Sequence, residues 1–428
     1  MRGGLEDTIC AIATPAGEGG IGIVRLSGHQ ALGIADGLVK LRSGQSLASV
    51  VTHTLHLADL LIPASVKQPE SSVHPRGSAA TDLLDEALVV YMKAPRSFPA
   101  EDVVEIQSHG GWLVLSMLCR ACVMAGARLA EPGEFTKRAF LNGRIDLSQA
   151  EAVLNTIRAR SAASLTAAQR QLRGDLAREV DTAREALLGL LAHLEAGIDF
   201  VEEDIEFLQK QELLQTIERV AALVQRLQAT AKEGRLLREG ARVVIVGRPN
   251  VGKSSILNRL LREDRAIVTA VPGTTRDVIE ESVDLGGLMI HLVDTAGIRD
   301  TADIVETEGI KRSRSAQEDA DLRIIVIDGS VPLTHDDFSL IEQAVLAKHV
   351  IAINKADLPA QFDASSIDPR AFTVGLSAKT GAGVDQLRAA IRLQLVGAGA
   401  ETADGVIVTN VRHQAALDRA GDSLHHAA

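Results

Sequence analysis

The chain has 428 residues, enough for roughly two to four domains, and its hydrophobic content of 46% can fill their cores. The formal net charge of −11 argues against broad, nonspecific binding to nucleic acid and leaves room only for a local basic face. No apolar run approaches about 18 residues and no signal peptide opens the chain, which predicts a cytoplasmic protein without a membrane span.

Residues 1–120 alternate short apolar runs with Gly and Pro turns. The runs at 21–26, 88–92 and 103–107 have the composition of strands, and residues 63–80 form a polar loop rich in Pro and Ser. This pattern predicts a compact α+β domain.

The three cysteines are Cys10, Cys119 and Cys122, too few and too scattered for a disulfide framework. Cys119 and Cys122 share one face of an apolar helical stretch at 113–123, and no second Cys or His pair accompanies them. We therefore expect buried thiols, not a zinc site, in a reducing compartment.

Residues 121–239 are predicted to be helical, because apolar side chains recur there every three or four positions. Such stripes are core or helix-pairing faces more often than cofactor sites. Basic clusters also occur, and most clusters of this kind are solvated helix faces, not RNA contacts. The stripes are Val180, Leu187, Leu191 and Leu194, and Leu213, Ile217, Val220, Val224 and Leu227; the basic clusters are residues 311–314, and Arg158, Arg160, Arg170 and Arg173.

Residues 247–254 read GRPNVGKS, a complete phosphate-binding loop between an apolar strand at 242–246 and the start of a helix at 255–261. Gly247 and Gly252 let backbone N–H groups surround the β-phosphate, at a helix N-terminus that favours anions. Lys253 can reach the β- and γ-phosphates, and the Ser254 hydroxyl can bind Mg²⁺. The loop residues predicted to bind GTP are Asn250, Val251, Gly252, Lys253, Ser254 and Ser255.

Three further motifs follow in the order of a guanine-nucleotide hydrolase: DTAG at 294–297, NKAD at 354–357 and SAK at 377–379. Asp294 can hold Mg²⁺ through water, and the Gly297 N–H can meet the γ-phosphate. Asp357 can accept from both N1–H and N2–H₂ of guanine, whereas ATP would leave this carboxylate unpaired. The other residues predicted to bind the base are Asn354, Lys355, Ser377, Ala378 and Lys379.

The stretch PGTTRD at 272–277 predicts the first switch, in which Thr274 or Thr275 closes over Mg²⁺; spacing does not decide between the two. Ras-like enzymes orient water with a glutamine just after the DxxG glycine, and here that position is Ile298. Glu306 is a candidate general base or water-positioning residue, although its spacing alone fits a solvated carboxylate better.

Strands alternate with helices over 240–395, which predicts a parallel α/β domain, and Gly286 and Gly287 predict a hairpin that adds one antiparallel strand. After a Gly- and Ala-rich linker at 396–405, residues 409–426 are again predicted to be helical. We expect residues 396–428 to complete the helical domain of residues 121–239, so that the GTPase domain is an insertion. The predicted fold class is multidomain α/β, with an α+β N-terminal domain, a helical domain and an inserted Ras-like P-loop GTPase domain.

The whole sequence, over nearly all of residues 5–428, resembles the MnmE (TrmE) family of tRNA-modification GTPases. The resemblance rests on long motifs in every part of the chain. These are DTI at 7–9, RLSG at 25–28, EPGEFT at 131–136, NGRIDL at 142–147, IDF at 198–200, and residues 247–255 and 272–277.

The resemblance implies an N-terminal domain that dimerises and binds 5-formyltetrahydrofolate or a related folate. It also implies a homodimer that works with the flavin-binding partner MnmG (GidA). Together they place a carboxymethylaminomethyl or aminomethyl group on C5 of the wobble uridine of certain tRNAs, while GTP hydrolysis drives the conformational cycle.

The resemblance also assigns site residues. It implies K⁺ between two GTPase domains, where a cation offsets charge that develops on the phosphates. It further implies that Thr275 and Ser254 bind Mg²⁺. Glu306, which orients the attacking water, and Lys253 are the implied catalytic residues. The implied K⁺ ligands are Asn250, Thr269, Val271 and Thr274, of which Thr269 and Thr274 also line the nucleotide; the implied folate residues are Arg25, Glu105 and Arg144.

Two departures from the family pattern affect these expectations. Arg144 stands where the family usually has Lys. The family chain also runs on to a C-x-G-K motif, whereas no cysteine follows Cys122 here, so we expect nucleotide binding to survive and place tRNA modification in doubt. Two alternatives stay open: a GTP-dependent ribosome-assembly switch, which would lack the N-terminal segment, and a member that hydrolyses GTP without modifying tRNA.

Overall fold

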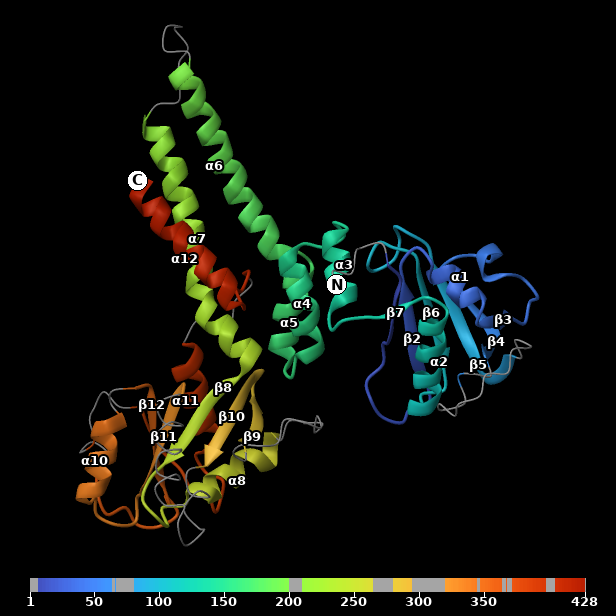
Figure 1. Cartoon of the computed structure of the whole chain (residues 1–428). Coiled ribbons are helices and arrows are strands. Elements are labelled where there is room, and N and C mark those ends of the chain that lie inside the picture. The colour runs from blue at the N-terminus through green and yellow to red at the C-terminus, as the bar shows by residue number, and fades with distance from the viewer. Residues whose placement is uncertain are drawn as a thin grey trace, which may run out of the picture. The chain divides into compact units, whose positions relative to one another are not determined.

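The computed structural model describes residues 7–63, 66, 81–199, 210–264, 280–294, 320–344, 347–363, 367, 372–397 and 405–427. The chain divides into two compact units, Met1–Ala150 and Glu151–Ala428 (Figure 1). No helix in these described ranges is both long and apolar enough to cross a membrane.

Unit 1 is built on a seven-stranded sheet, and the helices α1, η1 and α2 share one apolar core with its strands. Its strands are β1 (Ile9–Ile12), β2 (Gly22–Ser27), β3 (Val39–Leu41), β4 (Leu55–Pro63), β5 (Thr81–Met92), β6 (Val103–Ser108) and β7 (Arg128–Leu129), and its helices are α1 (Ala31–Asp36), η1 (Leu47–Ser49), α2 (Trp112–Met124) and α3 (Glu134–Leu141), with α4 (Leu147–Arg158) crossing into unit 2.

The strand order in this sheet is β3-β4-β5-β6-β2-β1-β7, antiparallel except for the pairing of β1 with β7. The predicted strand runs at 88–92 and 103–107 lie within β5 and β6, and the run at 21–26 overlaps β2, which begins one residue later. Cys10 on β1 and Cys119 and Cys122 on α2 are buried free thiols, which confirms the prediction for the two helical cysteines.

Unit 1 extends beyond residue 120, where the sequence analysis places its boundary. The reason is that β7 pairs with β1, with Ile9 opposite Arg128 and Cys10 opposite Leu129. A two-residue strand carries almost no periodicity, so the sequence pattern does not reveal it.

Unit 2 contains long helices and a second sheet. The helices that flank the sheet domain in the sequence are α5 (Ala162–Leu172), α6 (Asp175–Asp199), α7 (Lys210–Glu239) and α12 (Val411–Ala427).

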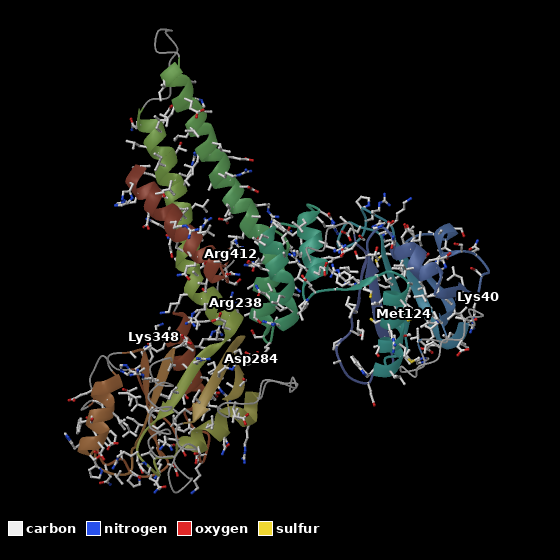
Figure 2. All side chains as sticks on the ribbon, in the orientation of Figure 1. Lys40, Met124, Arg238, Asp284, Lys348 and Arg412 are labelled. Carbon is white, nitrogen blue, oxygen red and sulfur yellow. The ribbon has the colours of Figure 1, made fainter. Side chains whose placement is uncertain are left out.

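Helix α12 lies along α7, although the whole sheet domain separates them in the sequence. Leu424 of α12 shares a buried cluster with Ile217, Val220 and Val224 of α7. Arg412 lies at the start of α12 (Figure 2). It donates a 2.8 Å hydrogen bond to Glu151 of α4. The sheet domain is therefore an insertion between α7 and α12.

Both apolar stripes are predicted to be packing faces, but the structure buries only the stripe on α7. The stripe of α7 is buried from Ile217 to Leu227, as expected. On α6 the expectation is wrong for three of four positions, because Val180, Leu191 and Leu194 are 44%, 49% and 41% exposed. The face of α6 that packs consists instead of Ala183, Ala186, Leu187 and Leu190.

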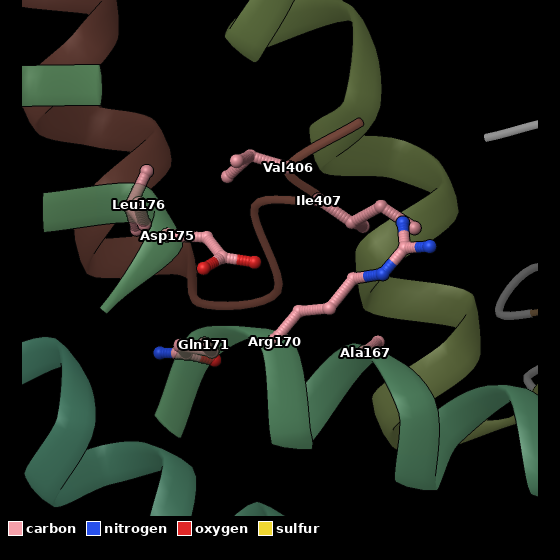
Figure 3. Close-up of a pocket in the computed structure, with 7 residues that line it drawn as sticks. All are labelled: Ala167, Arg170, Gln171, Asp175, Leu176, Val406 and Ile407. Carbon is pink, nitrogen blue, oxygen red and sulfur yellow. The ribbon is translucent and has the colours of Figure 1, made fainter. Parts of the chain in front are cut away.

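The chain returns to the helices through residues 405–410, which lie against α5 and α6 beside a small recess (Figure 3). Arg170 of α5 donates a 3.2 Å hydrogen bond to the Gly405 carbonyl. Thr409 Oγ1 donates to Gln171 Oε1 at 3.0 Å, and both side chains are buried. These bonds fix the point where the inserted domain rejoins the helices.

The second sheet has six strands in the order β13-β12-β11-β8-β10-β9. Five are parallel, and β9 is an antiparallel edge strand joined to β10 by Gly286 and Gly287, which confirms the predicted hairpin. Its elements are β8 (Ala241–Val246), α8 (Lys253–Asp264), β9 (Glu280–Leu285), β10 (Leu288–Asp294), β11 (Leu322–Asp328), α10 (His335–Ala344), β12 (His349–Asn354), β13 (Thr373–Gly375) and α11 (Val384–Val396).

Helices cover both faces of this sheet. Residues of α8 and α11 share one apolar cluster with the strands, and Ile341 of α10 belongs to a second cluster with the other set of strand side chains. The strands are accordingly apolar almost throughout, as a parallel sheet buried on both faces requires.

Candidate nucleotide-binding site

All four nucleotide motifs begin where a parallel strand ends. Residues 247–252 follow β8, Asp294 ends β10, Asn354 ends β12, and Ser377 follows β13 closely. Because the carboxyl ends of parallel strands meet at one edge of a sheet, the four motifs converge there. The strand order changes direction at β8, which is the position where open α/β sheets bind ligands.

The phosphate loop depends on two glycines for different reasons. A Cβ on Gly247 would lie 2.5 Å from the Val326 carbonyl oxygen, so this residue lets the loop pass close to β11. Gly252 has a φ of +99°, and a Cβ there would lie 2.2 Å from Asn354 Nδ2. Either side chain would displace the loop from the strands that carry it.

Lys253 is held by the loop itself. Its ammonium donates to the carbonyl oxygens of Gly247 at 2.9 Å and of Arg248 at 2.7 Å. Ser254 and Ser255 are exposed in the first turn of α8, the end of a helix whose backbone N–H groups attract anions. The cation and these N–H groups together give a site for a phosphate chain.

Asn354 joins the phosphate loop to the base-binding loop. Its Nδ2 donates to the Val251 carbonyl at 2.8 Å, and its Oδ1 accepts from the Ala378 N–H at 3.0 Å. The side chain is only 3% exposed, so both bonds are formed away from water.

Asp357 is oriented for base recognition by Ser377, whose hydroxyl donates to Asp357 Oδ1 at 2.6 Å. This hydrogen bond lowers the pKa of Asp357, so the carboxylate is charged at neutral pH. Lys379 lies exposed in the same loop. The arrangement presents a carboxylate to the N1–H and N2–H₂ donors of guanine.

Lys355 of the base motif has a φ of +65° and forms a 2.6 Å ion pair with Asp328 at the end of β11. Burial raises the pKa of Asp328, but hydrogen bonds from Lys355 and Ser330 outweigh this and hold the pKa below its usual value. The sequence analysis did not identify Asp328. The available signal was a single carboxylate at the end of the apolar run Ile324–Ile327.

Part of the predicted site lies outside the described residues, and the backbone of Asp294 is described without its side chain. Among described residues no cluster of three or more His, Cys, Asp or Glu could hold a metal ion. The predicted residues that lie outside are Thr269, Val271, Thr274, Thr275, Gly297 and Glu306.

The residues expected to bind folate belong to unit 1. Arg25 on β2 and Glu105 on β6 are opposite each other in register and form a 2.7 Å ion pair. The Arg25 guanidinium also lies 5.5 Å from the ring centre of Phe135. The Arg144 side chain is exposed and, within the described part of the chain, forms no hydrogen bond or ion pair, so it is not joined to this pair.

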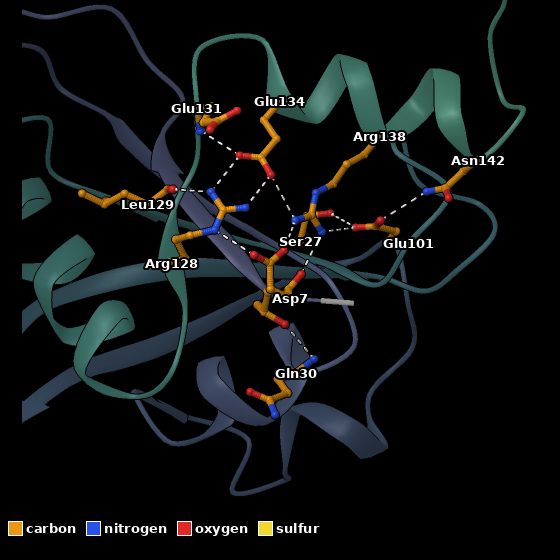
Figure 4. A network of polar contacts seen from close by, with 11 residues as sticks. Asp7, Ser27, Gln30, Glu101, Arg128, Leu129, Glu131, Glu134, Arg138 and Asn142 are labelled. Carbon is orange, nitrogen blue, oxygen red and sulfur yellow. Dashed lines mark hydrogen bonds and ion pairs between the residues drawn. The ribbon is translucent and has the colours of Figure 1, made fainter. Parts of the chain in front are cut away.

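The EPGEFT motif belongs to a partly buried ionic network in unit 1 (Figure 4). Glu134 pairs with Arg128 at 2.7 Å and with Arg138 at 3.1 Å, and both arginines also pair with Asp7. Burial raises the pKa of Glu134, but hydrogen bonds, above all from Arg128, lower it to about 2. The motif thus ties α3 to the segment that leads into β1.

The fold and the site together define a P-loop GTPase: a parallel α/β sheet that carries a phosphate loop, a DxxG segment and a guanine-specific NKxD motif at one edge. Models of known families match almost the entire chain. The MnmE helical domain matches residues 147–428, and the GTP-binding protein TrmE N-terminus matches residues 8–144.

The chain belongs to the MnmE family. It is 46% identical to the tRNA modification GTPase MnmE of Enterococcus faecalis, over 98% of this chain and 87% of that protein. It is 46% identical to the protein of the same name from Moorella thermoacetica, over 99% and 89%, and 44% identical to that of Geobacillus kaustophilus, over 98% and 89%. The predicted fold class is confirmed, and so is its assignment as a GTP hydrolase.

Proposed function

We propose that this chain is a K⁺-stimulated, homodimeric GTPase of tRNA modification in the cytoplasm. With the flavin-binding partner MnmG it would add a carboxymethylaminomethyl or aminomethyl group at C5 of the wobble uridine. The observation that carries the proposal is the combination of an organised GTP site with family matches in both units. The match to the TrmE N-terminus disfavours the ribosome-assembly alternative.

In the hydrolysis step, a water oxygen attacks the γ-phosphorus and the bond from this phosphorus to the β–γ bridging oxygen breaks, which leaves GDP and phosphate. Lys253 stabilises charge on the β- and γ-phosphates from the position that its two carbonyl partners set. Glu306 is assigned to orient the water. Because Ile298 cannot take the role of the Ras glutamine, a different residue must orient the water.

Metal ligands are assigned from the same site. Ser254 and Thr275 would hold Mg²⁺, which would offset negative charge on the phosphates. Asn250, with Thr269, Val271 and Thr274, would hold K⁺, which supplies positive charge near the β- and γ-phosphates. The exposed Asn250 side chain suits this role, since no other group in the described ranges hydrogen-bonds to it.

A folate site in unit 1 is the second part of the proposal, with Arg25, Glu105 and Arg144 as its residues. The Glu105 carboxylate can accept from the adjacent N–H groups of a pterin ring, and Arg25 is already fixed beside it by the 2.7 Å ion pair. Binding of 5-formyltetrahydrofolate, measured by calorimetry, should fall at least tenfold in Glu105→Gln; unchanged affinity would remove this site from the proposal.

The decisive experiment compares GTP turnover in KCl and NaCl at equal ionic strength. We expect strong stimulation by K⁺, abolished in Asn250→Ala and retained in Asn410→Ala, a matched change just before α12 and outside the nucleotide site. Glu306→Ala should slow single-turnover hydrolysis while leaving GTP binding intact. Equal rates in the two salts would contradict the K⁺ assignment, and wild-type hydrolysis by Glu306→Ala would contradict the role of Glu306.

A further inference from the structure

A buried ion pair outside the nucleotide contacts connects the phosphate loop to α10. Arg248 Nε donates to Asp337 Oδ1 at 2.8 Å. The Asp337 side chain is 1% exposed and that of Arg248 is 25% exposed. Because the Asp337 carboxylate has lost nearly all contact with water, its charge must be balanced by well-placed partners inside the protein.

The second oxygen of Asp337 is fixed by the start of α10. Asp337 Oδ2 accepts from the Thr334 N–H at 2.9 Å and from the Thr334 hydroxyl at 2.8 Å. A carboxylate in the first turn of a helix is also favoured by the helix dipole. Asp337 is therefore an anchor whose position is set by the helix and does not depend on the loop.

The backbone of Arg248 is part of the site that holds the catalytic lysine, since its carbonyl accepts from Lys253 Nζ at 2.7 Å. Arg248 stands between Gly247, which has no side chain to restrict the backbone, and Pro249, whose ring restricts it. The bond from the Arg248 side chain to Asp337 on α10 therefore restricts the backbone at this end of the loop, where Gly247 alone would leave it mobile.

We propose that Arg248 is a positioning residue for GTP hydrolysis: its ion pair with Asp337 fixes the loop carbonyl that holds Lys253 in place. The side chain of Arg248 is directed to α10 and not to the nucleotide, so it acts through Lys253. Loss of the pair lets this carbonyl move and lowers the stabilisation that Lys253 gives to the transition state more than the binding of GDP.

The test must separate positioning from folding, because removing Arg248 alone leaves a buried carboxylate unpaired. The double variant Arg248→Met with Asp337→Asn removes both charges, while the asparagine still accepts from Thr334. We expect its midpoint of thermal unfolding to return close to wild type, with kcat for GTP about tenfold lower and GDP affinity changed less than threefold. Asp336→Asn, an exposed neighbour on the same helix, is the matched control and should behave as wild type.

Wild-type turnover by the double variant would overturn the proposal, and so would losses of turnover that follow the unfolding midpoint across all variants. If the double variant is unstable, Arg248→Lys and Arg248→Met decide the matter at a temperature where both are folded. Lysine can still pair with Asp337, so it should restore a substantial part of kcat; equal kcat in the two variants would overturn the proposal.

Discussion

At the contact between α7 and the returning segment at 405–410, helix propensity and packing predict opposite effects on stability when a glycine is replaced by alanine. Gly234 lies inside α7, where replacing Gly by Ala usually stabilises a helix by about 1 kcal/mol. A Cβ at Gly234, however, would lie 2.0 Å from the Val408 carbonyl oxygen and 2.7 Å from its carbon. Both atoms are backbone, so no side-chain rotation relieves the overlap.

The size of the effect follows from these two opposing contributions. Overpacking at a closely packed contact costs about 1–3 kcal/mol, and the helix propensity of alanine offsets about 1 kcal/mol of it. The hydrogen bond from the Val408 N–H to Thr230 Oγ1, 3.1 Å long, is lost if the segment moves away. With about 1 kcal/mol for this hydrogen bond, we expect Gly234→Ala to lower the free energy of unfolding of the helical part by about 1–3 kcal/mol.

Calorimetry of the full chain measures this change, with Gly189→Ala as the control. Gly189 also lies inside a long helix, α6, but no described atom beyond its own stretch of helix lies within 4 Å of the position of its Cβ. The control should raise the unfolding midpoint, while Gly234→Ala should lower it and speed tryptic cleavage after Arg412. If both substitutions raise the midpoint equally, the close approach of α7 and Val408 is wrong.

Three further predictions concern the nucleotide site and the ionic network. Asn354→Ala removes the side chain that pairs with the Val251 carbonyl and the Ala378 N–H, so the free energy of binding a fluorescent GDP analogue should weaken by about 2–4 kcal/mol. Asn410→Ala is the control and should leave this affinity unchanged. A loss of affinity below threefold in Asn354→Ala would contradict the bridging role. Asp357→Asn should reduce the preference for GTP over ATP in competition binding, and an unchanged preference would disprove its role. Because the pKa of Glu134 falls from 4.5 to about 2 on folding, its contribution, at most about 3 kcal/mol, is complete above pH 4.5 and is lost as the pH falls toward 2. Denaturant titrations should therefore show a smaller loss of stability over this range in Glu134→Gln than in the wild type, and equal losses would contradict the assignment.

The GTPase domain could be predicted from the sequence because its signals are contiguous. One phosphate-binding motif contains Gly247, Lys253 and Ser254. The other three motifs begin at or just after the end of a strand. A parallel sheet brings such strand ends to one edge whatever the lengths of the connections. The position of the motifs relative to the strands thus predicts the site before any tertiary contact is known.

The ion pairs of the site could not be predicted in this way. Arg248 is separated from Asp337 by most of the sheet domain, and Asp337 resembles its exposed neighbour Asp336 in sequence. The α6 stripe was misjudged for a related reason: periodicity identifies an apolar face, but only a neighbouring element decides whether Leu191 or Leu187 is covered.

The two carboxylates that the sequence analysis did not identify lie at opposite ends of one connector, which runs from the end of β11 to the first turns of α10. Asp328 holds Lys355 of the base motif, and Asp337 holds Arg248 of the phosphate loop. Since Asn354 independently bridges Val251 and Ala378, the base and phosphate halves of the site are joined both directly and through this connector. A substitution at Asp328 or Asp337 therefore disturbs a nucleotide motif through Lys355 or Arg248. When it is combined with a substitution at Asn354, the change in GTP affinity or turnover of the double variant should differ from the sum of the two single changes.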